Sequence, residues 1–181
     1  MARLWDQLED QFPDVGVGWE WPRCVQKVTL LVGPTGAGKS TYTRDNFDVN
    51  DVISSDAIRL KLFNTLENRG DQSQIFERVR TEARMRLASG KRVVIDATHI
   101  VARDRIVNAL LVPSDMPVEH VVIDRPMAEK LATADQRKPH VLEQHARIFE
   151  DNKQAIMACD DLQNVRVKIL CRDGSRNGLA I

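Results

Sequence analysis

One stretch of the chain combines glycines, a lysine and hydroxyl side chains at a spacing suited to holding phosphate. Residues 33–41 read GPTGAGKST, and Gly33, Gly38, Lys39 and Ser40 occupy every fixed position of the pattern G-x-x-x-x-G-K-[ST]. In such a loop, backbone N–H groups at the start of a helix point at phosphate oxygens, and glycine lets the main chain approach them closely. The sequence therefore predicts a nucleotide phosphate site, the P-loop.

The pattern gives separate tasks to its side chains. Lys39 is expected to reach the β- and γ-phosphates, and the Ser40 hydroxyl to bind a magnesium ion, so ATP and Mg²⁺ are the cofactors expected. A glycine turn beside an unrelated lysine is disfavoured, because the strand-like run before the loop and the helix expected after it agree with the pattern. The residues expected to bind nucleotide are Gly33, Thr35, Gly36, Ala37, Gly38, Lys39, Ser40 and Thr41.

Two aspartates at the ends of predicted strands are candidates for the rest of the chemistry. Asp56 ends VISSD and Asp96 ends VVID, and the carboxyl ends of parallel strands open onto the ligand crevice. Asp56 is expected to take a proton from an attacking hydroxyl, and Arg59 to grip a phosphate of the acceptor. Asp96 is expected to hold the magnesium ion. A helix N-cap with a surface arginine, and a strand-end cap, are the alternatives.

Phosphoryl transfer also needs positive charge on the oxygens of the transferred group. The polar segment TADQRKPH, residues 133–140, offers Arg137 and Lys138 where a lid is expected, between the fourth strand and the last long helix. Either side chain is a candidate for this charge, and a solvated loop is the alternative. His99 follows Asp96 closely, and a lone histidine is more often a hydrogen-bonded structural residue than an acid or a base.

Basic side chains also gather between residues 72 and 92. Such a stripe can follow a nucleic-acid backbone, or it can be a solvated helix face, which its composition favours. The stripe comprises Arg78, Arg80, Arg84, Arg86, Lys91 and Arg92.

The elements that must position these residues follow the rhythm of an α/β fold. Strand-like runs alternate with longer amphipathic segments, which predicts about five parallel strands flanked by helices, a P-loop NTPase-type sheet with a small lid. Apolar residues at helical spacing predict one helix over 73–89, ended by Gly90, and another over 141–159. The predicted strands are 27–33, 51–56, 92–98, 118–124 and 165–170.

The whole chain of 181 residues fits one main domain. Residues 25–181 are expected to form it, with 1–24 as an extension packed against it. That extension holds Trp5, Trp19 and Trp21, which favours a packed cap, with a stacking platform for bases as the alternative. Because 26 basic residues balance 26 acidic ones, any site for a polyanion must be local.

The cysteines and the N-terminus indicate a cytoplasmic protein. The three cysteines lack C-x-x-C or metal-ligand spacing, and their odd number argues against a disulfide framework. No stretch approaches the roughly 18 apolar residues of a membrane span, and no export signal is evident.

Taken in order, these residues resemble the polynucleotide 5′-hydroxyl kinase family, the kinase half of the phage-type polynucleotide kinase-phosphatases and its bacterial relatives. The similarity extends from LLVGPTGAGKST through VISSDAIR and VVIDATH to VVIDRPMAEKLATADQRKP, with the spacing preserved. The resemblance implies that Asp56 is the general base on a nucleic acid 5′-OH and that Arg59 holds the adjacent phosphate of the acceptor strand. It also implies that Arg137 contacts ATP phosphates from a lid.

The chain departs from the family pattern in two places. The family commonly has Asp-x-Thr-Asn where residues 96–99 read DATH, so an imidazole must make any contact of that Asn amide. Family lids often carry two arginines four residues apart; here Arg137 fits the second position and Thr133 occupies the first. A single arginine clamp implies either weaker ATP binding or help from Arg125 or Lys138. No D-x-D-x-T phosphatase motif is found, so 3′-phosphate removal is not expected.

The expected function is ATP- and Mg²⁺-dependent transfer of the γ-phosphate to a 5′-hydroxyl end of RNA or DNA. A small-molecule P-loop kinase acting on a nucleoside, a sugar or a nucleotide-sugar is the first alternative, which the zero net charge favours slightly. A nucleotide-binding module without catalysis is the second. The presence of both Asp56 and Arg59 argues against this second alternative, because a module that only binds nucleotide needs no base for an acceptor.

Overall fold

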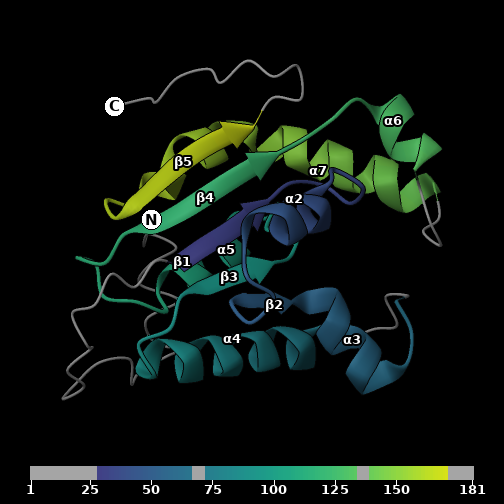
Figure 1. Cartoon of the computed structure of the whole chain (residues 1–181). Coiled ribbons are helices and arrows are strands. Elements are labelled where there is room, and N and C mark those ends of the chain that lie inside the picture. The colour runs from purple at the N-terminus through teal and green to yellow at the C-terminus, as the bar shows by residue number, and fades with distance from the viewer. Residues whose placement is uncertain (1–27, 67–71, 134–138, 171–181) are drawn as a thin grey trace.

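A computed structural model describes residues 28–66, 72–133 and 139–170 of the chain. Five strands there form one parallel sheet in the order β2-β3-β1-β4-β5, and their arrows point in one direction in Figure 1. The predicted α/β fold with a parallel sheet is confirmed. The strands are β1 (Val28–Val32), β2 (Val52–Ser54), β3 (Val93–Asp96), β4 (Val118–Ile123) and β5 (Val165–Leu170).

Helices join the strands, as the crossover connections of a parallel sheet require. α4 (Ser73–Ala88) and α7 (Pro139–Met157) match the two predicted helices with slightly different ends. The buried residues of α4 recur at the predicted helical spacing along one face. The remaining helices are α2 (Lys39–Asn46), α3 (Ser55–Phe63), α5 (Ala102–Ala109) and α6 (Met127–Ala132), with a short 3₁₀ helix, η1 (Cys159–Asp161).

The second strand is shorter than its sequence pattern predicts. β2 ends at Ser54, and Asp56 belongs to the first turn of α3 rather than to a strand end. The reason is a cap: the Ser54 hydroxyl accepts a hydrogen bond from the backbone N–H of Ala57 at 3.2 Å, which starts the helix early. Asp56 still lies beyond the carboxyl end of its strand, where the site was expected.

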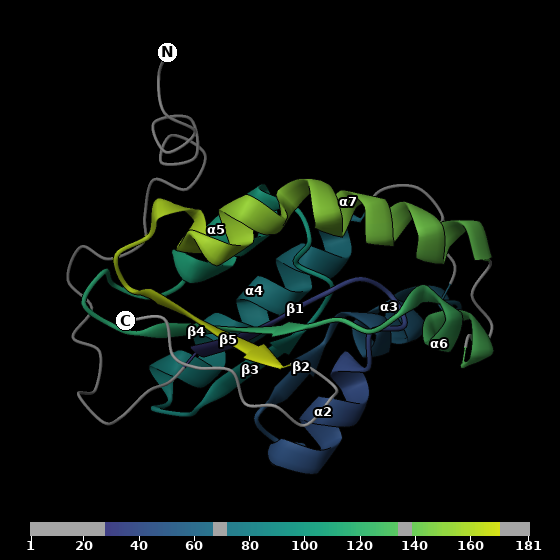
Figure 2. The ribbon, with the colours of Figure 1, turned by 90° about the horizontal axis from the view of Figure 1, so that it is seen from above.

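Alternate residues of the central strand face different layers of helices. Leu30 packs in a cluster with apolar residues of α4 and α5, and Val32 packs in another with Phe149 of α7. Leu31 faces the opposite side, in a cluster that Tyr42 of α2 packs against. Figure 2 shows the same layers, with α5 and α7 on one side of the sheet and α2 on the other. β1 is therefore buried on both faces, which fixes the loop that follows it.

The carboxyl ends of the strands share one edge of the sheet, and hydrogen bonds join the segments that leave it. The N–H of Gly33 donates to the carbonyl oxygen of Thr98 at 2.9 Å, which ties the loop after β1 to the loop after β3. The Ser55 hydroxyl donates to the carbonyl oxygen of Asp96 at 3.2 Å, which ties the start of α3 to the end of β3. The candidate residues on these segments are thus brought to one place.

Some predicted features lie outside the described residues. They are the extension 1–24 with its tryptophans, and Arg137 and Lys138 of the expected lid. Within the described part of the chain, every helix is too short or too polar to cross a bilayer.

Candidate active site

The loop after β1 has the backbone that its glycines predict. Gly38 has φ 98° and is the N-cap of α2, a left-handed conformation that disfavours side chains. At Gly33 a Cβ atom would lie 2.0 Å from the backbone oxygen of Ile123, so no larger residue fits between β1 and β4. Since α2 begins directly after Gly38, its first backbone N–H groups border the loop, the arrangement that binds anions at helix N-termini.

The Lys39 side chain lies inside the loop. It is 8% exposed, and its Nζ donates to the carbonyl oxygens of Gly33 at 2.9 Å and Pro34 at 2.8 Å. A buried ammonium group needs such partners, because leaving it unpaired would cost several kcal/mol. The loop therefore carries a positive charge at its centre, where the sequence predicts phosphate.

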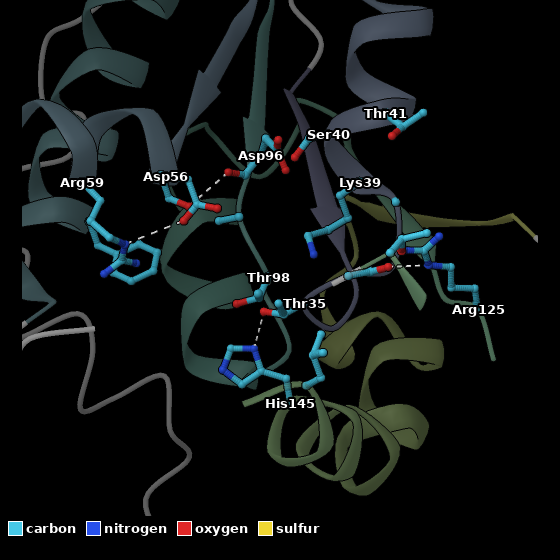
Figure 3. Close-up of a pocket in the computed structure, with 17 residues that line it drawn as sticks. Thr35, Lys39, Ser40, Thr41, Asp56, Arg59, Asp96, Thr98, Arg125 and His145 are labelled. Carbon is cyan, nitrogen blue, oxygen red and sulfur yellow. Dashed lines mark hydrogen bonds and ion pairs between the residues drawn. The ribbon is translucent and has the colours of Figure 1, made fainter. Parts of the chain in front are cut away.

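Ser40 and Asp96 come from different elements and line the same cavity. Asp96 ends β3 and is 7% exposed, and Figure 3 shows its carboxylate and the Ser40 hydroxyl pointing toward one another. Hydroxyl and carboxylate oxygens suit Mg²⁺, which takes few protein ligands and completes its shell with water and phosphate. No group of three or more His, Cys, Asp or Glu in metal-binding range occurs among the described residues. The donor set thus fits Mg²⁺ bound together with a nucleotide.

Asp56 and Arg59 face the cavity from α3. Arg59 Nε lies 3.7 Å from Asp56 Oδ1, and the side chains are 13% and 38% exposed respectively. The guanidinium of Arg59 also donates from Nη1 to Oε1 of Gln72, the residue before α4. The i, i+3 spacing on one helix brings this carboxylate and this guanidinium together, as the sequence predicts.

The N-cap alternative for Asp56 does not fit. Ser54, not Asp56, supplies the side-chain cap of α3, and Arg59 is too buried to be a surface arginine. Asp56 instead lines the cavity, as Asp96 does.

A cavity of about 280 Å³ contains most of the predicted site residues. Gly33 and Ala37 do not line it: Gly33 packs against the backbone of Ile123, and Ala37 is 3% exposed and belongs to a core cluster with Leu31. The predicted residues that line it are Thr35, Gly36, Gly38, Lys39, Ser40, Thr41, Asp56, Arg59 and Asp96. The lining is completed by Ser55, Phe76, Ala97, Thr98, Arg125, Thr133, Leu142 and His145.

The sequence matches an AAA domain family, AAA_33, over residues 28–157. That range includes the phosphate loop, both aspartates and every residue that lines the cavity. The chain belongs to this AAA domain family. The parallel five-stranded sheet flanked by helices is its P-loop NTPase-like fold. No curated protein matches the chain.

Solved structures similar to the AAA domain share its P-loop fold. A chain of the Pnkp1/Rnl/Hen1 RNA repair complex is 22% identical with a TM-score of 0.62, and the match covers 74% of this chain but only 47% of that one. A gluconokinase from Sinorhizobium meliloti 1021 is 14% identical with a TM-score of 0.54, covering 83% and 86%. AvrRxo1-ORF1:-ORF2 with ATP is 17% identical with a TM-score of 0.58, covering 84% and 57%. At these identities the similarity establishes the fold alone.

α7 of the AAA domain reaches the site through a residue that sequence reasoning missed. His145 Nδ1 lies 2.6 Å from the Thr35 hydroxyl of the loop, as Figure 3 shows. Leu142, one turn earlier on α7, would be 3.0 Å from a Cβ atom at Gly36, so the helix packs directly on the loop. No local pattern could reveal these contacts, because they join residues more than a hundred positions apart.

His99, the departure from the Asp-x-Thr-Asn pattern, is structural in the AAA domain. It is 1% exposed, and its Nε2 accepts from Asn108 Nδ2 at 3.0 Å, so Nδ1–H donates to the Leu31 carbonyl oxygen at 2.8 Å. Burial lowers the pKa of His99 to about 4, so the ring is neutral at pH 7. The interpretation as a hydrogen-bonded structural residue is confirmed, and the ring does not line the cavity.

The six basic residues near α4 do not share one solvated face. Arg86 pairs with Glu82 and donates to the backbone oxygen of Val52, so it packs against β2. The guanidinium of Arg92 lies over the Phe47 ring, 4.7 Å from its centroid. At least these two side chains make contacts within the domain. Fewer basic side chains therefore remain for a surface that could bind nucleic acid.

Proposed function

We propose that this AAA domain protein is an ATP- and Mg²⁺-dependent kinase that transfers the γ-phosphate to the 5′-hydroxyl end of RNA or DNA. The observation that carries the proposal is that Asp56 and Lys39 line one cavity, with Arg59 beside Asp56. A kinase needs a phosphate-binding cation and a base for the acceptor in the same space.

On the donor side, the loop and Lys39 bind the β- and γ-phosphates of ATP. Ser40 and Asp96 hold Mg²⁺, which neutralises the charge of the phosphate oxygens when bound. The N–H groups at the start of α2 add a fixed positive field. Arg137, carried over from the family resemblance, contacts the nucleotide phosphates from the segment between α6 and α7.

On the acceptor side, Asp56 orients the 5′-hydroxyl and accepts its proton. Its 38% exposure leaves the carboxylate accessible to a substrate that enters the cavity. Arg59 binds the phosphate next to the reacting nucleotide through charge-assisted hydrogen bonds. The ring of Phe76, which lines the same cavity, gives a base a surface for stacking.

A small-molecule acceptor is the second candidate. The cavity of about 280 Å³ is modest, the chain has no net charge, and part of the basic surface near α4 is used internally. The similarity to a gluconokinase also covers most of both chains. The pairing of Arg59 with Asp56 favours a phosphate-bearing acceptor over a neutral sugar.

The test is a transfer assay with γ-labelled ATP and Mg²⁺. The acceptors are a 5′-OH oligonucleotide, a 5′-phosphate oligonucleotide, and a panel of nucleosides and sugars. Label is expected on the 5′-OH oligonucleotide alone. Label on the nucleosides or sugars would support the second candidate, and no label on any acceptor would contradict both.

The variant Asp56→Asn tests the proposed role of Asp56 as the base. The variant should lose transfer by a factor of about 10² to 10⁴, because a positioned proton acceptor contributes that much, and should bind ATP like the wild type. Asp151→Asn on the exposed side of α7 is the matched control and should behave as wild type. Near wild-type transfer by Asp56→Asn would remove Asp56 from its role.

A further inference from the structure

Arg125 leaves the end of β4 and reaches the phosphate loop. Its Nε donates to the carbonyl oxygen of Gly36, and its Nη2 donates to the hydroxyl of Thr133 at the end of α6. Figure 3 shows the guanidinium on the side of the loop away from Asp56 and Arg59. Arg125 and Thr133 both line the cavity.

Basic side chains lie on different sides of the cavity. Among the described lining residues, the lysine and arginine side chains are those of Lys39, Arg59 and Arg125. Lys39 lies within the loop and Arg59 lies beside Asp56 on α3. Arg125 thus brings positive charge to the remaining side, next to the loop residue Gly36.

The surroundings hold the Arg125 guanidinium in this position. Thr133 fixes one end of it, and the Thr133 hydroxyl in turn donates to the Glu129 carbonyl oxygen at 2.9 Å within α6. Asp124, the neighbouring acid in sequence, pairs with the buried Lys130 at 2.5 Å. A Cβ atom at Gly36 would lie 3.4 Å from the Lys130 side chain, so α6 packs closely on the loop. A guanidinium that hydrogen bonds hold in one position is preorganised to bind phosphate oxygens.

We propose that Arg125 is a phosphate-binding residue for ATP, contacting the polyphosphate from the α6 side of the loop. The inference rests on the proposed function as an ATP-dependent kinase. In phosphoryl transfer, most of the catalysis is positioning and charge, so a fixed cation at this point both binds ATP and stabilises the charge on the transferred group. In this proposal Arg125 assists Arg137, the single arginine predicted in the lid, in binding the phosphates.

The experiment measures nucleotide binding without any acceptor, by calorimetry with ATP and with adenosine, together with thermal unfolding. Arg125→Gln keeps a donor for Gly36 but removes the charge, and should weaken ATP binding about 10- to 100-fold while leaving adenosine binding unchanged. Arg125→Gln combined with Thr133→Arg returns a guanidinium to the same spot and should recover most of that loss. Arg166→Gln, on an exposed position of β5, is the matched control.

Wild-type ATP affinity in Arg125→Gln would overturn the proposal. Equal weakening of ATP and adenosine would also overturn it, since that result would mean that Arg125 only docks α6 on the loop. If thermal unfolding shows that Arg125→Gln does not fold, Arg125→Lys replaces it. Lysine keeps the charge but loses the fork, so ATP binding should fall severalfold, and unchanged affinity would contradict the proposal. Because no acceptor is present, failure of the 5′-hydroxyl assignment would leave these results intact.

Discussion

Acid should destabilise this protein through His99, and His99→Asn should remove part of that sensitivity. Burial lowers the pKa of His99 to about 4 from 6.5, with smaller contributions from Lys39 and Arg105. Because the folded-state pKa lies below the unfolded one, the unfolded state binds the proton more strongly. The stability that the neutral ring contributes is therefore complete above pH 6.5 and is lost as the pH falls toward 4.

The size of the loss follows from the pKa shift. Proton linkage gives a loss of about 1 kcal/mol at pH 6 and about 2 kcal/mol at pH 5. His120 of β4 is also buried, and burial lowers its pKa to about 3. His120 adds to the acid sensitivity of both proteins, and part of its lowered pKa is due to His99. The difference between the two curves therefore reports His99 together with its effect on His120.

Asparagine is the substitution that this position tolerates best. His99 has φ 46°, in the left-handed region where Asn is enriched among residues other than glycine. The Nδ2 of an asparagine at position 99 can donate to the Leu31 carbonyl oxygen, as the imidazole does. Asn108 keeps its hydrogen bond to the Asp104 carbonyl oxygen at 2.9 Å. The lost contact with Asn108 should cost about 1 kcal/mol at neutral pH. The two stability curves should then cross near pH 6.

The assay is urea unfolding at pH 7.5, 6 and 5 for the wild type, His99→Asn and a control, His140→Asn. His140 is exposed at the start of α7, so its substitution should leave the pH dependence unchanged. If His99→Asn loses as much stability between pH 7.5 and 5 as the wild type, His99 is not a buried neutral group and the reasoning fails.

Two further predictions concern the loop and the acceptor side. Gly33→Ala should lower the free energy of unfolding by about 1–3 kcal/mol and weaken ATP binding, because its Cβ would meet the Ile123 backbone oxygen at 2.0 Å; wild-type melting and ATP affinity would contradict this packing. Arg59→Ala should raise the KM for a 5′-OH oligonucleotide about tenfold or more with little change in ATP affinity, and an effect confined to the KM for ATP would place Arg59 on the donor side instead.

Local patterns predicted the parts of the molecule whose structure is decided locally. The loop from Gly33 to Ser40 depends on glycines at fixed positions, and α4 depends on apolar residues that recur at helical spacing, so both could be recognised from the sequence. The end of β2 was predicted too late because a single hydroxyl, that of Ser54, caps α3 and ends the strand earlier than its apolar pattern indicates.

Tertiary contacts explain the elements and residues that were missed. α5 buries Arg105 and Asn108, which interrupt any apolar pattern: Arg105 forms a buried ion pair with Asp160, and Asn108 bonds His99. These partners lie outside α5, and Asp160 is 55 residues from Arg105. The partner of His145, Thr35, lies in the loop after β1. The sequence of α7 alone therefore could not predict that His145 belongs to the site.

The separation of the proposed base and the proposed metal ligand is set by the backbone. Ser54 of β2 pairs with Asp96 of β3, and the Ser55 hydroxyl bonds the Asp96 carbonyl oxygen, so Asp56 follows directly from that register. A slip of one residue between these strands would turn every side chain of β2 to the opposite face. Core substitutions that keep this register should therefore change stability without changing the geometry between Asp56 and Asp96, whereas loss of the Ser54 cap should loosen the turn that carries Asp56 and so affect transfer before it affects ATP binding.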